Sequence, residues 1–127
     1  MKKLTLALMA LLALTACQTK PNRPSAPAPS GQAGQVATLQ RVNASAYECW
    51  RGDKAFNKYG IIPELDTTGT PRILVIPKGK PQALPQLVIT ATGRSIQTFG
   101  PLATSPLASR INADVSRWAD GDTGCSA

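Results

Sequence analysis

Continuous runs of apolar residues in the second half of the chain predict a small β-sheet. Residues 72–76, with the sequence Arg-Ile-Leu-Val-Ile, form a largely β-branched run that follows a Gly-Thr-Pro segment and ends at Pro77. A short run of this kind, bounded by turn residues, is typical of a strand that is covered on both faces. We therefore expect a strand over residues 72–77.

Two more apolar segments, residues 86–91 and residues 94–99, lie on either side of Thr92-Gly93. If these two residues form the turn, the segments make a β-hairpin in which Ile89 lies opposite Ile96. Thr-Gly is a weaker turn former than Asn-Gly, and a register shifted by one residue would exchange the two faces of the hairpin. The pattern thus predicts two antiparallel strands beside the first.

The strongest helix signal begins at Ser105-Pro106, because Ser is a favourable N-cap and Pro a favourable first helical residue. Apolar residues then recur at spacings of four, four and three, which predicts one apolar stripe along a helix. The stripe consists of Leu107, Ile111, Val115 and Trp118. Two glycines, Gly121 and Gly124, are typical of a helix end. We expect a helix over residues 106–119 that lies across the strands.

The segment before residue 72 gives weaker signals. Asn43 is a candidate N-cap for a short helix that would place Tyr47 beside Trp50. The tripeptide at residues 51–53, Arg-Gly-Asp, then predicts a turn. This tripeptide is also the integrin-adhesion motif, but three residues recur by chance in many proteins, so we favour the turn.

The N-terminus has a different pattern. A positive start, Met1-Lys2-Lys3, precedes an apolar run of about eleven residues, too short for a membrane span of roughly 20 residues and fitting the core of a secretory signal. The segment at residues 14–17, Leu-Thr-Ala-Cys, resembles the lipobox of bacterial lipoproteins. The resemblance implies that residues 1–16 are cleaved and that Cys17 is lipidated and acylated, with the acyl chains as the contact with the membrane. Gln18 after this cysteine, in place of Asp, implies sorting to the outer membrane of a Gram-negative envelope, facing the periplasm.

Residues 17–35 follow as the lipidated anchor and a linker rich in Pro, Gly, Ser and Gln. The linker has no large apolar residue before Val36 and no periodicity, so it cannot bury enough surface to offset the entropy of ordering. We expect it to be a disordered spacer, stiffened by proline in its first half. A Pro-rich ligand for a partner's groove is the alternative. Residues 36–127 then form a single small domain.

Three cysteines are present, and lipidation of Cys17 leaves Cys49 and Cys125. Unpaired thiols are unusual in an oxidising compartment, so we expect a Cys49–Cys125 disulfide. The whole pattern predicts an α+β fold, in which about three antiparallel strands are covered by the C-terminal helix and tied by this bridge. No zinc site is expected, because the chain has no histidine and no Cys-x-x-Cys pair.

Charge and composition narrow the function classes. The chain carries +7, but residues 36–127 have ten Lys and Arg against seven Asp and Glu, hence only +3. No basic run with interleaved aromatics suggests nucleic acid. The absence of histidine excludes catalytic triads of the Ser-His-Asp and Cys-His types, and no phosphate-binding glycine loop is present. We expect no cofactor, no metal and no nucleic acid partner.

Some charged residues still allow functional alternatives. Arg110 and Arg117 could form an anion site, although pairing with Asp114 on the same exposed helix side is the favoured interpretation. Two pairs of carboxylates are formally open to acid–base chemistry, although turn and helix-end roles fit them better. These pairs are Glu64 with Asp66 and Asp120 with Asp122.

Three functions follow from these patterns. The favoured one is a non-catalytic, lipid-anchored accessory or structural lipoprotein that docks with other envelope proteins. The second is a periplasmic binding module for peptidoglycan, an anionic polymer or a hydrolase, although the Ser-Gly-Tyr signature of lysozyme inhibitors is lacking. The third is a carboxylate-based hydrolase. The sequence does not determine the oligomeric state.

Overall fold

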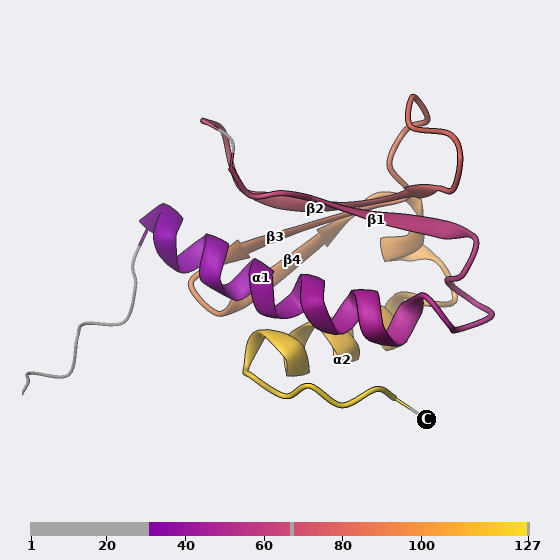
Figure 1. Cartoon of the computed structure of the whole chain (residues 1–127). Helices are drawn as coiled ribbons and strands as arrows, with labels where there is room; N and C mark the ends of the chain where they lie inside the picture. The colour runs from indigo at the N-terminus through magenta and orange to yellow at the C-terminus, as the bar shows by residue number, and fades with distance from the viewer. Residues whose placement is uncertain (1–30, 67, 127) are drawn as a thin grey trace, which may run out of the picture.

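The computed structural model of the chain describes residues 31–66 and 68–126, which form two helices on one side of a four-stranded sheet (Figure 1). All neighbouring strands are antiparallel, in the order β1-β2-β3-β4. The elements are α1 (Gly31–Trp50), β1 (Tyr59–Glu64), β2 (Arg72–Pro77), β3 (Leu87–Thr92), β4 (Ser95–Phe99), the 3-10 helix η1 (Pro101–Thr104) and α2 (Ala108–Ala119). The expected α+β fold with a C-terminal helix and one disulfide is confirmed, with four strands in place of three.

The core lies between the sheet and the two helices. Strand residues alternate between the two faces of a sheet, and one set of alternating residues on β2 and β3 is fully buried. These residues are Ile73, Val75, Leu87, Ile89 and Ala91. They pack with buried residues of the helices in one continuous cluster. Burial of the apolar surface of this cluster is the main favourable contribution to the fold.

Helix α2 presents the predicted stripe to the core. Ile111, Val115 and Trp118 are at most 1% exposed, and Leu107 is half-buried. The helix begins at Ala108 and not at residue 106, because the two preceding residues form a turn. The hydroxyl of Ser105 accepts a hydrogen bond from the backbone N–H of Leu107 at 3.1 Å. The serine therefore caps this turn and not the first turn of α2.

Helix α1 differs most from expectation. It runs for 20 residues from Gly31, so residues 31–35, which we assigned to the linker, are helical. Asn43 lies in its middle and is not an N-cap. The buried side of α1 consists largely of small residues, which let the helix approach the sheet closely but leave little hydrophobic signal in the sequence. Its buried residues are Gly34, Thr38, Leu39, Val42, Ser45, Ala46 and Trp50.

Strand β1 was not predicted. Its six residues include Gly60 and Pro63, both of which weaken a strand signal. The strand lies at the edge of the sheet and pairs only with β2. Proline has no backbone N–H to donate, and an edge strand tolerates this loss better than a central strand does. β1 pairs with β2 over its whole length, from Tyr59 opposite Pro77 to Glu64 opposite Arg72.

The β3–β4 hairpin is confirmed, but its register differs by two residues from the prediction. Ile89 pairs with Thr98, and Ile96 pairs with Ala91. The turn residues are Gly93 and Arg94, and Gly93 has a φ of 60°, a conformation that glycine adopts without strain. Because a shift of two residues preserves the alternation, the apolar face of the hairpin remains the one we expected.

The expectation that residues 72–77 are covered on both faces is only partly correct. On the side away from the helices, Leu74 is half-buried and only Ile76 is buried, with 6% exposure. Both helices lie on the opposite side of the sheet (Figure 1). The strand is therefore apolar on both faces, but one of those faces is open.

Candidate functional site

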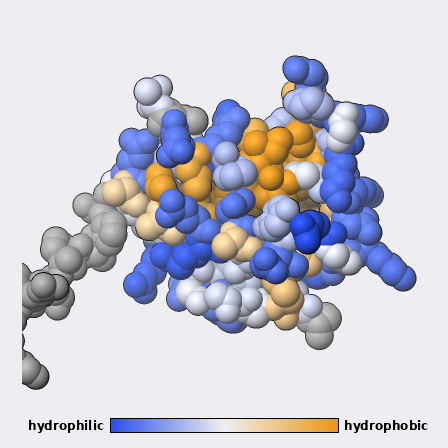
Figure 2. All heavy atoms as spheres, viewed as in Figure 1, coloured by the Kyte–Doolittle hydropathy of each residue, from blue (hydrophilic) through white to orange (hydrophobic). Residues whose placement is uncertain are grey.

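The open face of the sheet carries an apolar row that crosses all four strands. Ile62 of β1 pairs with Leu74 of β2, Leu74 with Val88 of β3, and Val88 with Phe99 of β4. Paired residues point to the same side of a sheet, so these four side chains are neighbours. Phe99 is 54% exposed and Ile62 is 38% exposed. In the view of Figure 2, which has α1 toward the viewer, hydrophobic side chains also reach the surface over β1 and β2.

A polar row borders the apolar one. At one end Arg72 donates to Glu64 across the β1–β2 pair. At the other end Thr90 and Gln97 lie opposite each other, and the threonine hydroxyl lies 3.4 Å from the glutamine side-chain oxygen. A shallow depression of about 490 Å³ lies between the two rows and is lined partly by Val88. The open face thus has an apolar centre with a polar border, the usual anatomy of an interaction surface.

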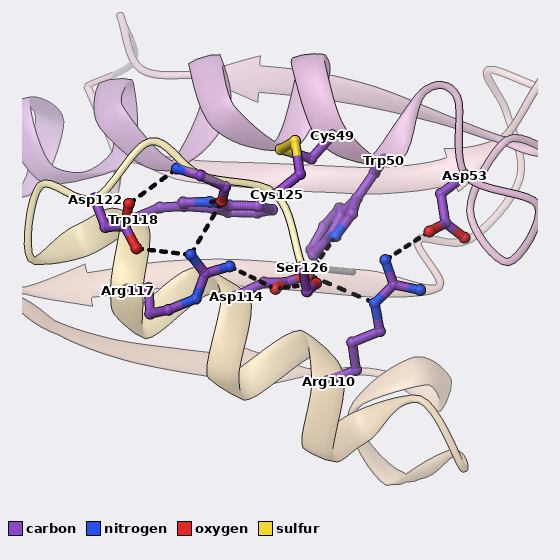
Figure 3. Close-up of a disulfide and its surroundings, with 11 residues drawn as sticks. Cys49, Trp50, Asp53, Arg110, Asp114, Arg117, Trp118, Asp122, Cys125 and Ser126 are labelled. Carbon is purple, nitrogen blue, oxygen red and sulfur yellow. Dashed lines mark hydrogen bonds and ion pairs between the residues drawn. A yellow bond between two sulfur atoms is a disulfide. The ribbon is translucent and has the colours of Figure 1, made fainter.

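The covered side of the sheet contains a closed polar network, centred on Asp114 of α2 (Figure 3). Asp114 is 1% exposed. Its carboxylate accepts the indole N–H of Trp50 at 3.0 Å, the guanidinium of Arg117 at 3.0 Å and the hydroxyl of Ser126 at 2.7 Å. Arg110 Nε lies 3.8 Å from the same carboxylate. A buried charge is stable only when it is paired and hydrogen-bonded in this way.

Arg110 connects this network to the turn after α1. Its Nη2 donates to the Asp53 carboxylate at 2.6 Å, and the backbone N–H of Ala55 donates to the same side chain at 2.8 Å. The hydrogen bond from Arg110, with the one from Ala55, holds the pKa of Asp53 below its ordinary value, and the same bond raises the pKa of Arg110. Asp53 therefore stabilises the turn that we predicted at residues 51–53.

Arg117 is paired as well. Its Nη1 donates to Asp122 at 2.8 Å and to the carbonyl of Gly124 at 3.0 Å. The bonds to Asp122 and Asp114 raise the pKa of Arg117, while the backbone N–H of Gly124, followed by Arg117, lowers the pKa of Asp122. We expected Arg110 and Arg117 to pair with Asp114 on an exposed side of the helix. The pairing is present, but Asp114 is buried, so this side is not fully exposed. Both guanidinium groups are occupied within the protein.

The Cys49–Cys125 disulfide is present and joins the end of α1 to the segment after α2, across a sequence separation of 76 residues (Figure 3). The indole N–H of Trp118 donates to the carbonyl of Gly124 at 2.9 Å, beside the bridge. The C-terminal segment is therefore fixed against both helices. Cys17, the expected lipidation site, lies outside the described residues.

The two carboxylate pairs considered in the sequence are held differently. Glu64 is paired with Arg72, and together with Asp66 they line an open depression of about 560 Å³ at the end of β1. Asp122 is bound to Arg117, whereas Asp120 is exposed and follows α2 as its C-cap. Asp120 and Asp122 thus serve as the helix-end residues that we favoured.

Within residues 31–66 and 68–126, no group of three or more potential metal ligands occurs. In the same part of the chain, neither helix has the length and hydrophobicity needed to cross a membrane. Comparison of the chain with family models, with curated proteins and with solved structures gave no match. The arguments for function therefore come from the sequence and from the geometry described above.

Sequence reasoning missed the apolar row as a unit. Ile62 belongs to a strand that was not predicted, and Phe99 could not be aligned with Val88 in the register that we expected. One signal was present: residues 72–76 are apolar at every position after Arg72, so both faces of this strand carry apolar side chains, and the face away from the helices was expected to be covered as well.

Proposed function

We propose that this protein is a lipid-anchored lipoprotein of the bacterial cell envelope, without catalytic activity, whose domain docks onto another envelope protein through the open face of the sheet. The anchor rests on the lipobox-like segment that ends at Cys17, and placement in the outer membrane rests on Gln18. The docking role rests on one observation, the apolar row of Ile62, Leu74, Val88 and Phe99, whose two outer members are exposed and whose two inner members are half-buried.

The chemistry of this row favours a protein as the partner. Three of its members are aliphatic and offer no hydrogen-bond donor or acceptor, so a polar sugar polymer would lose hydration there without compensation. An apolar strip on another protein would gain free energy by covering the row. The Glu64–Arg72 pair at the border supplies polar groups of both signs, which suits the rim of a protein interface.

The size of the face indicates how firmly such a partner would bind. Four strands at about 4.8 Å spacing and five to six residues at about 3.3 Å each give roughly 350 Å². A standard interface covers roughly 800 Å² on each partner. The row alone would therefore bind weakly. A lipid anchor at Cys17, fourteen residues before α1, would raise the effective concentration of a partner in the same membrane and so compensate for the small area.

The internal pairing of the charged side chains supports a non-catalytic role. Asp53, Asp114 and Asp122 are all bound by arginines on the covered side. Glu64 is bound by Arg72. Acid–base catalysis requires a carboxylate that is free to exchange a proton with a substrate, whereas each of these four carboxylates is bound by an arginine.

Site-specific photo-crosslinking in intact envelopes tests the proposal. A photoreactive residue at Val88, on the open face, should give one discrete crosslinked protein band, and a photoreactive residue at Ser116, exposed on α2, should give none. Replacing Cys17→Ser should release the protein from the membrane fraction and weaken the Val88 crosslink. Equal crosslinking from both positions, or none from Val88 in the anchored protein, would contradict docking through this face.

A further inference from the structure

A second surface lies at the end of the molecule where α1 stops, β1 starts and β2 ends. Lys58 precedes β1 and Lys78 follows β2, and their backbones are joined by a hydrogen bond of 3.0 Å from the Lys78 N–H to the Lys58 carbonyl. Arg51 follows α1 directly. Lys54 and Lys80 occupy the same two turns. Five cationic side chains thus gather at one end of the domain.

These cations differ from the arginines of the covered side, because no salt bridge within the described residues involves any of them. The nearest acidic residues in sequence are Glu48 and Asp53. The Asp53 carboxylate is already bound by Arg110 at 2.6 Å, and Glu48, two residues before the end of α1, takes part in no ion pair within the described residues. The positive charge at this end is therefore balanced only slightly by the protein itself.

Aromatic side chains line a recess of about 60 Å³ among these cations. Tyr47 is 49% exposed, and its hydroxyl accepts a hydrogen bond from Arg51 at 2.9 Å, while the guanidinium also lies 4.8 Å from the ring centre. Lys58 Nζ lies 5.4 Å from the ring centre of Tyr59. The recess therefore combines apolar ring surfaces with positive charge, and Lys78 is part of its lining.

The floor of the recess is rigid. Trp50 and Phe56 belong to its lining and are stacked with their ring centres 4.6 Å apart. Trp50 is also held by its hydrogen bond to the buried Asp114 and by an edge contact with Trp118 at 5.3 Å. A recess on such a support keeps its shape before a ligand arrives, which lowers the entropic cost of binding.

From this geometry we infer that the recess, with its five surrounding cations, binds an acidic glycan, a sugar polymer that carries carboxylate groups. The flat apolar faces of sugar rings match the exposed ring of Tyr47 and the half-buried ring of Tyr59, and the carboxylates match Arg51 and Lys78. A volume of about 60 Å³ admits a substituent of a few heavy atoms, such as a carboxylate or an acetyl group. A continuous sugar chain could then follow the lysines on either side of the recess.

The position of the recess agrees with this ligand. Helix α1 is about 30 Å long at 1.5 Å per residue, and the recess lies at its C-terminal end, whereas the N-terminal segment joins its other end at Gly31. If the domain is anchored through Cys17, as proposed above, the recess faces away from the attachment to the membrane. The recess would therefore contact a polymer layer next to the membrane more easily than it would contact the lipid surface. Only this step depends on the proposed anchor.

Binding of the full-length protein, purified in detergent, to defined polymers tests the inference. The probes are polygalacturonate as the acidic glycan, dextran as the neutral one, and phosphatidylglycerol vesicles as an anionic lipid surface. We expect saturable binding to polygalacturonate and none to dextran. Replacing Arg51→Ala together with Lys78→Ala should raise the Kd at least about tenfold, the loss expected for two charge-assisted contacts.

Two controls make the test specific. Arg94→Ala removes one charge at the β3–β4 turn, whose Gly93 carbonyl accepts from Thr38 in the first half of α1, far from the recess. This variant should change the Kd less than about twofold, since distant surface charges are screened. Tyr47→Ala should weaken binding, whereas Tyr47→Phe, which retains the ring, should largely restore it.

Three results would overturn the inference: no binding to polygalacturonate, an equal effect of Arg94→Ala, or tighter binding to the vesicles through the same residues. If the double variant folds poorly, the single variant Lys78→Ala, at an exposed position, replaces it in the binding measurement. The Val88 crosslink described above should persist in all these variants. Failure of the glycan binding can therefore be distinguished from failure of the proposed docking.

Discussion

The two faces of the sheet differ in which side chains they bury: the covered face buries a charged side chain, whereas the open face exposes apolar ones. On the covered face, Asp114 is 1% exposed and its carboxylate accepts three hydrogen bonds from α1, α2 and the C-terminal segment. On the open face, Ile62 and Phe99 remain exposed although they are apolar. The covered face pairs its charged groups internally, although the buried Arg110 Nε makes no hydrogen bond and lies 3.8 Å from Asp114, whereas the open face leaves apolar surface in water. Buried and internally paired side chains are thus concentrated on one side of the sheet, and exposed apolar side chains on the other.

The arginines and lysines divide in the same manner. Arg110 and Arg117 are bound by carboxylates that hold the helices together. Arg51 and Lys78 belong to no ion pair within the described residues and surround an aromatic recess. Arg110 and Arg117 therefore serve the packing of the domain, whereas Arg51, which donates to the hydroxyl of Tyr47, and Lys78 carry charge that no carboxylate of the described residues neutralises by an ion pair.

The largest expected effect comes from comparing one aromatic residue on each face. Trp118→Ala should lower the free energy of unfolding by about 3–5 kcal/mol, because a fully buried ring and the contact with Trp50 are lost. Phe99→Ala, on the open face, should cost less than about 1 kcal/mol, since 54% of that residue is already exposed. Urea unfolding measures both. Similar costs for the two variants would show that the open face is part of the stabilising core.

Removal of the disulfide should have the next largest effect. The double variant Cys49→Ala, Cys125→Ala should lose about 2–4 kcal/mol, because a loop of 76 residues is no longer closed in the unfolded state. Thermal unfolding measures this loss. A reducing agent should lower the midpoint of the unaltered protein to that of the variant and leave the variant unchanged. Free thiols found by mass spectrometry without reduction would refute the bridge. The open face should still crosslink, if docking is independent of the covered side.

The smallest expected effect concerns acid stability. The pKa of Asp53 is lowered in the folded protein, chiefly by the hydrogen bond from Arg110. A lowered pKa adds stability above the unfolded value of about 3.9, and this contribution is lost as the pH falls through the folded value. Asp53→Asn should therefore be less stable than the unaltered protein at pH 7 and should lose less on acidification to pH 3.

Asp120→Asn is the matched control for that experiment, because Asp120 is exposed and its side chain makes no ion pair or hydrogen bond within residues 31–66 and 68–126. Its acid unfolding curve should follow that of the unaltered protein. If Asp53→Asn also follows that curve, the ion pair between Asp53 and Arg110 contributes nothing to the stability of the covered side.

The elements with strong local signals were predicted from the sequence. Strand β2 has the predicted bounds, residues 72–77, because its apolar run ends at a proline. The buried stripe of α2 was predicted because large apolar residues recur at helical spacing. The Cys49–Cys125 pair followed from counting cysteines once the lipobox-like segment had assigned Cys17 to lipid.

The helix and the strand whose stability depends on contacts with other elements, α1 and β1, were not predicted with their full bounds. α1 buries small residues such as Gly34, Ser45 and Ala46, whose burial becomes favourable only against a sheet that is already present. β1 contains Gly60 and Pro63 and is stable as a strand because β2 supplies its hydrogen bonds. Its register could not be read locally, since no short turn joins the two strands. The apolar row on the open face depends on that pairing and was therefore missed.

The sequence by itself determined the α+β class, the strand at residues 72–77 and the C-terminal helix stripe, since these follow from local periodicity and from bounding turn residues. It also determined the proposal of a lipid anchor, which rests on residues 14–17 alone. The tertiary structure decided that Asp114 is a buried hub, that the open face has an apolar row, and that Arg51 and Lys78 share one recess. These features join residues distant in sequence, and only the pairing of strands and the packing of helices brings such residues together.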